Sequence, residues 1–256
     1  MAAGLVGCAS AKPATIRVLS YNIHICQGMD KQFDIERIAG VIRQTEPDLV
    51  ALQEVDRGVE RSGRADQPAE LARLTGMHVV FEQNVPRQGG DYGNAVLSRY
   101  PIERHAHHFL PRFGSGEQRG MLEVHVRVDG RPLVFLATHF DHRPDDGERL
   151  ASVAELRKHV AEWKDLPVIV AGDLNATPDS PVIAQATEFL HDGFTAGTGD
   201  GFTFPADEPN RRIDYILHNG AAGLEAVESC VIPEPLASDH RPLLTVFRLE
   251  AAGRGQ

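Results

Sequence analysis

VIVAGDLN, at residues 168–175, joins a run of four apolar residues to a short polar end. An apolar run this short, bounded by turn residues, is typical of a strand buried inside a sheet that helices cover. Asp173 and Asn175 follow the apolar run directly. Because loops at one edge of an α/β sheet converge on a common crevice, the segment predicts an α/β fold with a polar site at a sheet edge.

Polar side chains stand at the ends of most other predicted strands. Besides Asp173 and Asn175, they are Asn22, His24, Gln53, Glu54, His139, Asp141, His142, Asp214, Asp239 and His240. Carboxylates, amides and imidazoles are groups that bind metal ions or phosphate oxygens. Residues distant in the sequence are therefore expected to form one site.

Helical and extended patterns alternate along the chain, with no repeat and no break in composition. Strands are expected at Thr15–Tyr21, Leu49–Leu52, His78–Phe81, Asn94–Ser98, Met121–Val128, Leu133–Thr138, Val168–Ala171, Ile213–Leu217 and Leu243–Leu249. Helices are expected at Asp34–Gln44, Pro68–Leu74, Gly147–Val160 and Pro181–Leu190. Hairpin-like pairs mixed with strand–helix–strand units indicate mixed sheets covered by helices. We expect one α/β domain over residues 14–250, with tails at 1–13 and 251–256.

The composition is that of a globular enzyme: 256 residues, 42% of them hydrophobic, with a formal net charge of −10. A protein that holds nucleic acid through its phosphates usually has a basic face, so nucleic acid is a possible partner but not the favoured one. An excess of carboxylates suits the binding of hard divalent cations.

The first residues allow two interpretations. Leu5-Val6-Gly7-Cys8 resembles the lipobox of bacterial lipoproteins, which predicts an exported, lipid-anchored protein. Only seven residues precede Cys8 and none is basic, so either the start has been trimmed or the match is chance, in which case a cytoplasmic protein is expected. No apolar run is long enough for a transmembrane helix, so membrane attachment is expected only if Cys8 is lipidated. The three cysteines do not form a disulfide framework.

Each polar residue also has a plainer explanation when it is taken alone. Glu54 is then a surface carboxylate, Asp173 caps a turn, and His139 is a hydrogen-bonded core histidine. Asp214 is harder to explain, because a carboxylate between Ile213 and Tyr215 is costly unless it is paired. The plain explanations weaken because all of these residues stand together at strand ends.

The motifs resemble those of the endonuclease/exonuclease/phosphatase superfamily, in family order from Ser20 to Pro242. They are Asn22 in SYNIH, Glu54 in LQEV, Asn94 in GNAVLS, Arg119 in QRG, His139 in THF, Asp173 and Asn175 in GDLN, Asp214 in RIDYI, and Asp239 and His240 in SDHRP. The superfamily includes deoxyribonucleases, inositol polyphosphate 5-phosphatases and neutral sphingomyelinases. The resemblance implies a four-layer α/β sandwich, with two mixed β-sheets packed face to face and helices outside.

The resemblance also implies a metal site and a nucleophile. Glu54 would be the main carboxylate ligand of Mg²⁺ or Mn²⁺, with Asn22 and Asp239 nearby. Asp173 would orient and deprotonate the attacking water, and Asn175 would hold a phosphate oxygen.

The remaining motif residues would stabilise charge. Asp214 would fix the His240 ring and favour its charged form, so that His240 donates to a phosphate oxygen. His139 would be a second donor or acid near the leaving group. Substrate and phosphate contacts are expected from Asn94, Arg119, His142 and His24.

One departure from the family pattern bears on the substrate. Some DNA-repair members carry an acid two residues after the equivalent of Asn22, where this chain has His24. The segment Tyr21–Asp30 and the pair His142-Arg143 look more like the bacterial hydrolase branch. The resemblance thus favours metal-dependent hydrolysis of a small or lipid-linked phosphoester. A nuclease is the alternative, and a non-catalytic binding relative is disfavoured because no motif residue is missing.

Overall fold

The apolar runs of the chain form two six-stranded sheets in the computed structural model, which describes residues 14–250. The first sheet has the strand order β11-β12-β1-β2-β4-β3. Its strands are β1 (Ala14–Asn22), β2 (Leu49–Arg57), β3 (His78–Arg87), β4 (Gly90–Ser98), β11 (Leu224–Val231) and β12 (Leu243–Leu249). The second sheet has the order β5-β6-β7-β8-β10-β9. Its strands are β5 (Arg104–Phe109), β6 (Gly120–Val128), β7 (Arg131–His139), β8 (Val168–Asp173), β9 (His191–Asp192) and β10 (Asp214–His218).

Each sheet contains one parallel pair of strands among antiparallel neighbours. In the first sheet β1 and β2 are parallel and α1 (Ile35–Thr45) connects them; in the second, β7 and β8 are parallel and α3 (Gly147–Glu162) connects them. Two further α-helices are α2 (Gln67–Thr75) and α4 (Pro181–Ala186). Parallel strands need such a crossover, which places a helix on the face of the sheet. The sheets are therefore mixed, as the sequence predicted.

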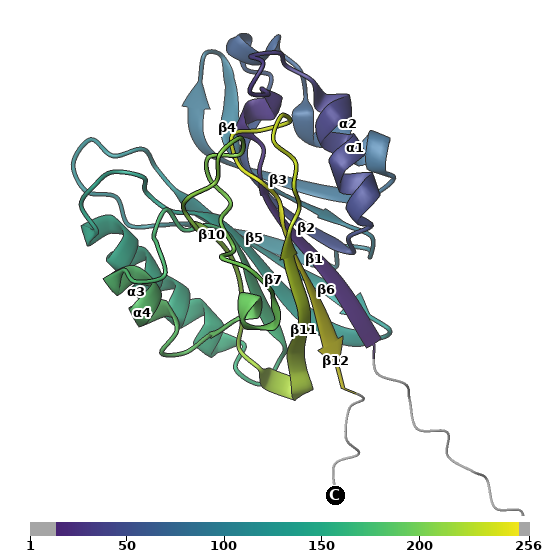
Figure 1. Ribbon diagram of the computed structural model, residues 1–256, viewed down its shortest axis with the longest axis vertical. Helices are drawn as coiled ribbons and strands as arrows, with labels where there is room; N and C mark the ends of the chain where they lie inside the picture. The colour runs from purple at the N-terminus through teal and green to yellow at the C-terminus, as the bar shows by residue number, and fades with distance from the viewer. Residues whose placement is uncertain (1–13, 251–256) are drawn as a thin grey trace, which may run out of the picture.

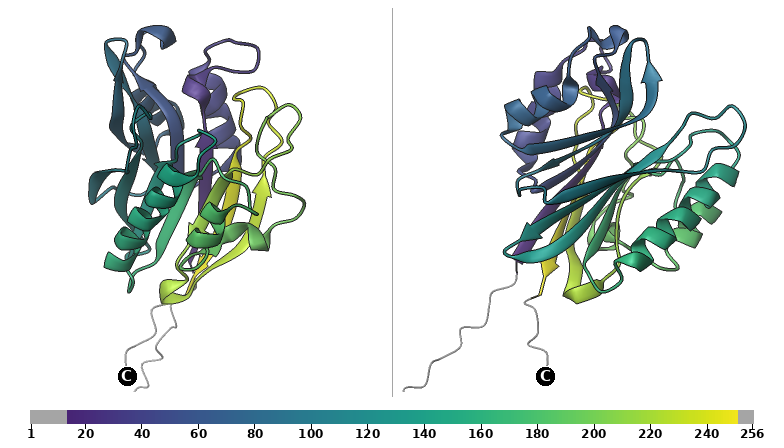
Figure 2. Two further views of the ribbon diagram at one scale, coloured as in Figure 1. Left: turned by 90° about the vertical axis from the view of Figure 1, so that its left-hand side faces the viewer. Right: turned by 180° about the vertical axis from the view of Figure 1, so that it is seen from behind.

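The layers follow from the alternation of side chains along the strands. In β1, Val18 packs into the core between the two sheets, whereas Leu19 packs against the helices of the first sheet. Helices α1 and α2 cover the outer face of the first sheet, and α3 and α4 cover that of the second (Figures 1 and 2). The predicted four-layer α/β sandwich is thus confirmed.

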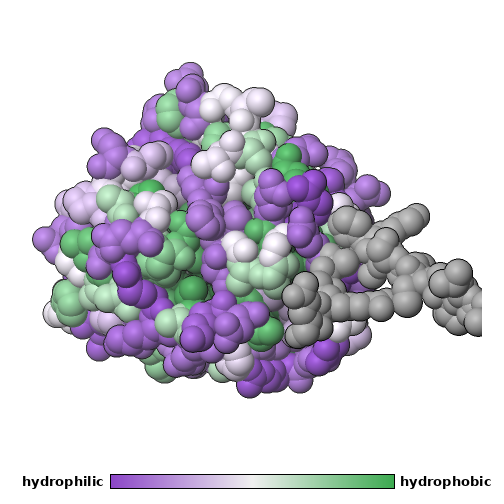
Figure 3. Space-filling view, turned by 90° about the horizontal axis from the view of Figure 1, so that it is seen from below, coloured by the Kyte–Doolittle hydropathy of each residue, from purple (hydrophilic) through white to green (hydrophobic). Residues whose placement is uncertain are grey.

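The two ends of the described chain meet far from the polar strand ends. Ala14 of β1 pairs with Leu249 of β12 at the lower end of Figure 1. Seen from below, this end mixes hydrophilic and hydrophobic residues (Figure 3). Because β1 runs away from it, the carboxyl end of β1 lies on the opposite side of the sandwich. The tails expected at 1–13 and 251–256, and the motif at Cys8, lie outside the described residues.

Several elements differ from the prediction. Strands β5, β9 and β11 were not anticipated, since β5 (RHAHHF) is polar and β11 lies at a sheet edge with exposed acids. Strand β2 continues past Leu52 to Arg57, and the helix expected to reach Leu190 ends at Ala186. None of the helices within residues 14–250 has the length and apolar character needed to cross a membrane.

Candidate active site

The carboxyl ends of the two parallel strand pairs meet where the sheets face each other. In the second sheet, Asp173 of β8 lies in register with His139 of β7 on one side and Asp214 of β10 on the other. Asn22, at the end of β1, reaches across from the first sheet and donates from Nδ2 to Asp173 Oδ2 at 3.2 Å. The polar strand ends predicted from the sequence therefore form one buried cluster.

Glu54 enters the cluster through a bulge in β2. The pairing of β2 with β4 shifts between Leu52 and Val55, and Glu54 has a φ of 57° in the left-handed region. Bulges re-aim side chains and are common beside active sites. Here Asn22 Nδ2 lies 3.2 Å from Glu54 Oε1, so one amide faces the carboxylates of both Glu54 and Asp173.

The Asp173 carboxylate is 1% exposed and is held from several sides. Its Oδ1 accepts the backbone N–H of Asn175 at 2.9 Å, and its Oδ2 lies 3.5 Å from His139 Nε2 and 3.7 Å from His240 Nε2. Burial, and then the charge of Asp214, raise the pKa of Asp173 to about 7. A carboxyl with this pKa can both accept and release a proton near neutral pH.

His240 is paired with a buried carboxylate. Its Nδ1 lies 2.8 Å from Asp214 Oδ2. Burial lowers the pKa of His240, but the charge of Asp214 and this hydrogen bond outweigh burial and raise the pKa to about 10. At neutral pH His240 is therefore a cation whose Nε2–H points toward the Asp173 side of the cluster. The ring of Phe204 packs 4.9 Å from the His240 ring, centroid to centroid.

His139 has a different protonation state. Arg119 Nη1 lies 3.0 Å from His139 Nδ1, and a guanidinium can only donate, so Nδ1 must accept. Burial, followed by the charge of Arg119, lowers the pKa of His139 well below its ordinary value. The neutral form of the ring is therefore favoured, and its Nε2 lies beside Asp173 Oδ2 and Asn175 Nδ2. The role expected for His139, a second donor or acid near the leaving group, stays a prediction.

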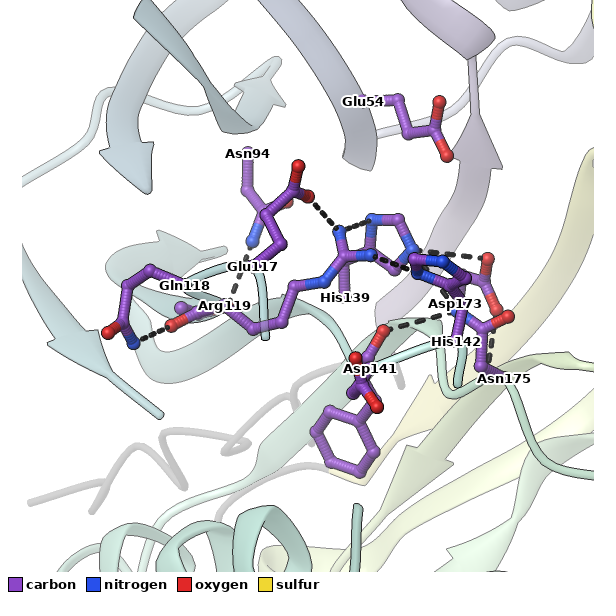
Figure 4. Close-up of polar contacts among 12 residues, drawn as sticks. Glu54, Asn94, Glu117, Gln118, Arg119, His139, Asp141, His142, Asp173 and Asn175 are labelled. Atoms are coloured by element: carbon purple, nitrogen blue, oxygen red, sulfur yellow. Dashed lines mark hydrogen bonds and ion pairs between the residues drawn. The ribbon is translucent and has the colours of Figure 1, made fainter. Parts of the chain in front are cut away.

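Arg119 links His139 to the loop that precedes β6 (Figure 4). Its Nη1 also lies 3.0 Å from Glu117 Oε1, and its Nη2 lies 3.1 Å from His142 Nδ1. Glu117 was not among the predicted site residues; its position two residues before Arg119 was the available signal. The contacts fix the guanidinium plane beside His139 and His142.

The other predicted residues lie around the same cluster. Asn94 donates to the backbone oxygen of Gly120 at 2.9 Å, and its Oδ1 is buried without a hydrogen-bond partner. His24 donates its backbone N–H to Asn22 Oδ1 at 3.1 Å, and its Nδ1 lies 3.8 Å from Asp239 Oδ1. Figure 4 shows Glu54 apart from the contacts that join Arg119, His139 and Asp173.

Asn175 contacts both Asp173 and His139. It has a φ of 49° and donates to the backbone oxygen of Phe140 at 3.1 Å, and its Nδ2 lies 3.2 Å from His139 Nε2. Left-handed φ values at non-glycine residues cost of order 1–3 kcal/mol each and gather at functional sites. Such values occur here at His24, Glu54 and Asn175.

The donor set of the cluster suits a divalent cation. The carboxylates of Asp173 and Asp214 lie in register within the cluster, with the cationic His240 ring as their partner, and Asp214 Oδ1 is buried without a hydrogen-bond partner. Glu54 and Asn22 add further oxygen atoms beside them. Buried carboxylates need compensating positive charge, and Mg²⁺ and Mn²⁺ prefer oxygen ligands of this kind.

Comparison with known proteins shows the family and agrees with the fold. The sequence model of the Endonuclease/Exonuclease/phosphatase family matches residues 19–240. The protein YbhP of Escherichia coli (strain K12) is 30% identical over 250 residues, which cover 92% of this chain and 97% of YbhP.

Two solved structures are similar to this chain in fold. An endonuclease/exonuclease/phosphatase from Beutenbergia cavernae matches with a TM-score of 0.75 at 26% identity, over 94% of this chain and 73% of that chain. A mannosyl-6-phosphatase from Bacteroides thetaiotaomicron shares the fold, with a TM-score of 0.75 at 18% identity, over 91% of this chain and 99% of that chain. Fold, motif order and sequence together show that this chain belongs to the endonuclease/exonuclease/phosphatase family.

Proposed function

We propose that this protein is a divalent-metal-dependent phosphoesterase that hydrolyses a small or lipid-linked phosphoester. Members of its family act as phosphoesterases and nucleases. The observation that carries the proposal is the buried arrangement of Asp173 between His139, His240 and Asn22. A water activated at Asp173 would attack the phosphorus, with hydrogen-bond donors around it.

The base of the reaction is Asp173. With a pKa of about 7 it is ionised above neutral pH and can take a proton from the attacking water. Asn22 and the backbone N–H of Asn175 hold its two oxygens, which fixes the direction of its lone pairs. Asp173 therefore both orients the water and accepts its proton.

His240 stabilises the negative charge that builds on the phosphate. The Asp214 carboxylate keeps the His240 ring protonated, so its Nε2–H can donate to a phosphate oxygen. His139 offers a neutral N–H nearby, and Asn175 would hold a further phosphate oxygen. Preorganised donors of this type stabilise a transition state more than a ground state, because the charge is larger there.

Glu54 is the proposed principal ligand of Mg²⁺ or Mn²⁺, with Asn22 and Asp239 beside it. The bound cation supplies positive charge for the phosphate and for the leaving oxygen. Asn94, Arg119, His142 and His24 complete the surroundings in which the substrate phosphate would lie.

A cavity of about 510 Å³ supports a small substrate. It lies between the β3–β4 hairpin and the loop before β6, and Glu117, the partner of Arg119, forms part of its wall. Phe109 and Arg112 line it as well, whereas Arg87 is paired with Glu117, so the cavity suits a leaving group with an apolar part.

The test is a substrate screen with purified protein in Mg²⁺ and in Mn²⁺. The panel contains p-nitrophenyl phosphate, its bis-ester, mannose 6-phosphate, phospholipid vesicles and plasmid DNA. We expect turnover of a small or lipid phosphoester that Asp173→Asn lowers about 10²–10⁴-fold. Asp179→Asn, a change of the same type at an exposed position, is the matched control.

Two results would contradict the proposal. Cleavage of plasmid DNA that far exceeds the cleavage of every small ester, and that Asp173→Asn abolishes, would make the protein a nuclease. No hydrolysis of any ester with either cation would favour a binding protein that retains the fold.

A further inference from the structure

A second group of metal-binding side chains lies outside the active site, on the face of the second sheet that α3 covers. Along β6, Leu122, Val124 and Val126 pack into the core between the sheets, whereas Glu123 and His125 point the other way, toward α3. Both are buried, at a place where apolar side chains would pack at lower cost. This departure from the usual pattern calls for a chemical reason.

Three elements bring the ligand group together. It consists of His108 from β5, Glu123 from β6 and His159 from α3, whose ligand atoms all lie within 4.8 Å of one another. His108 Nε2 lies 3.1 Å from Glu123 Oε2, and the rings of His108 and His159 are 3.9 Å apart, centroid to centroid. Small side-chain rotations would bring three such ligands to the distances of about 2.0–2.2 Å that a bound Zn²⁺ requires.

His159 adds an independent observation. Its side chain belongs to a residue only 9% exposed, and its Nδ1 is buried without a hydrogen-bond partner. Its other ring nitrogen, Nε2, lies 3.6 Å from Glu155 Oε1, and the nearest carboxylate to Nδ1 is that of the exposed Glu162, at 3.9 Å. A ring that has a carboxylate beside Nε2 and makes no hydrogen bond at Nδ1 resembles a metal-ligating histidine held by an outer carboxylate.

The carboxylate of Glu123 is also held from outside the group. His125 Nε2 lies 2.6 Å from Glu123 Oε1, which leaves Oε2 directed at His108. The ring of His125 packs edge-on against Trp163, at 4.8 Å between centroids. The ligand oxygen is therefore oriented before any cation binds.

We propose that His108, Glu123 and His159 form a second metal site, which takes a borderline divalent cation such as Zn²⁺. Two imidazoles and one carboxylate are a ligand set that Zn²⁺ and its neighbours prefer, whereas Mg²⁺ prefers oxygen alone. The cation takes the place of the proton between His108 Nε2 and Glu123 Oε2, and water fills the remaining position. Any imidazole that was protonated releases its proton to solvent.

The site would tie an edge strand to a helix. Strand β5 is the outermost strand of its sheet and leads directly into residues 110–119, which carry Glu117 and Arg119. A cation shared by β5, β6 and α3 would hold the start of that loop. The expected effect is stabilisation of the fold, separate from the chemistry at Asp173.

The experiment is calorimetric titration of the full chain with Zn²⁺ in excess Mg²⁺, which competes for the oxygen-rich active site. The variants are His108→Ala and His159→Gln, and the control is His105→Ala. His105 is on the same strand but lies opposite Val124, on the other face, and its Nε2 is 3.3 Å from Glu82. Circular dichroism checks that each variant is folded.

We expect the wild type and His105→Ala to bind one more Zn²⁺ than either variant of the site. We also expect Zn²⁺ to raise the melting temperature of the first two proteins only. Co²⁺ in the same site should show the visible absorption of a tetrahedral ion, lost in His108→Ala and His159→Gln. Equal Zn²⁺ stoichiometry and equal affinity in all four proteins would overturn the proposal, whatever their catalytic activity.

Discussion

Two polar clusters of this protein each bring three metal-binding side chains within 4.8 Å, yet they are built differently. The cluster around Asp173 lies at strand ends between the two sheets and is rich in carboxylates. The cluster around Glu123 lies within regular strands and a helix and is rich in imidazoles. The chemistry of the ligands and their place in the fold together indicate which cation each would hold.

The backbone shows the same contrast. Near Asp173, the residues Glu54 and Asn175 adopt left-handed φ values, whereas His108 and Glu123 lie in ordinary strands. Strained positions persist where the surrounding structure enforces them, and they aim side chains that regular strands cannot aim. We infer from this difference that the first cluster serves the proposed reaction and that the second, with its proposed cation, holds elements together.

The substitution with the largest predicted effect is Asp173→Asn, which should slow hydrolysis without weakening the fold. Asp173→Asn should lower kcat by about 10²–10⁴-fold, because the base is lost while the shape is kept. The pKa of Asp173 is raised to about 7 in the folded protein. Ionisation of this carboxyl therefore lowers the stability of the fold as the pH rises from the pKa of the carboxyl in the unfolded chain toward 7. The variant should therefore melt at a higher temperature than the wild type at pH 8.

Kinetics and thermal unfolding on the same samples test this, with Asp179→Asn as the control. A variant that loses both activity and stability would place Asp173 among the residues that hold the fold together. It would thereby erase the contrast between the two clusters.

The next effect is on the pH dependence of the reaction. Activity of the wild type should rise as pH passes about 7, where Asp173 ionises, and fall near pH 10, where His240 loses its proton. Asp214→Asn removes the charge that raises the pKa of His240, so its upper limb should move to lower pH, with kcat at pH 8 reduced about 100-fold. The pH profile of kcat for both proteins measures the shift. If the fall in activity stays near pH 10 in the variant, the pairing with Asp214 does not set the pKa of the group that loses its proton there.

The smallest effect concerns the arginine beside the active site. Arg119→Lys should lower kcat about tenfold, equal to ~1.4 kcal/mol, because one ammonium cannot reach both His139 and His142 as the guanidinium does. The ring nitrogen shifts of His139 in NMR spectra should change at the same time, since Nδ1 loses its donor. Arg157→Lys, on α3, is the control, and unchanged His139 shifts would show that Arg119 does not set the tautomer.

Much of the fold was readable in the sequence because apolar runs and their polar ends are local features. VIVAGDLN predicted both strand β8 and the place of Asp173, and the burial of Asp214 followed from its apolar neighbours. Strand β5 was missed because RHAHHF has no apolar alternation. It is a strand through its pairing with β6, which is a long-range contact.

The site was harder to read than the fold. The strand was expected to end at Leu52, so the bulge that aims Glu54 is visible only when the longer β2 pairs with β4. The pKa of His139 is lowered by burial and then by Arg119, which lies 20 residues away in the sequence. The second ligand group, His108, Glu123 and His159, forms only when α3 packs on the sheet, and the spacing of these residues in the sequence does not predict it.

Metal-dependent hydrolysis with Glu54 as the principal ligand is tested most directly by measuring the rate of hydrolysis against the concentration of cation. Protein freed of metal by chelation should be inactive, and Mg²⁺ or Mn²⁺ should restore activity. Glu54→Gln should need at least about tenfold more cation for half-maximal rate, because a neutral amide replaces the proposed carboxylate ligand. Glu60→Gln, at an exposed glutamate nearby in sequence, should behave as the wild type. Full activity of the chelated protein, or equal cation requirements for Glu54→Gln and the wild type, would contradict a metal-dependent phosphoesterase centred on Glu54.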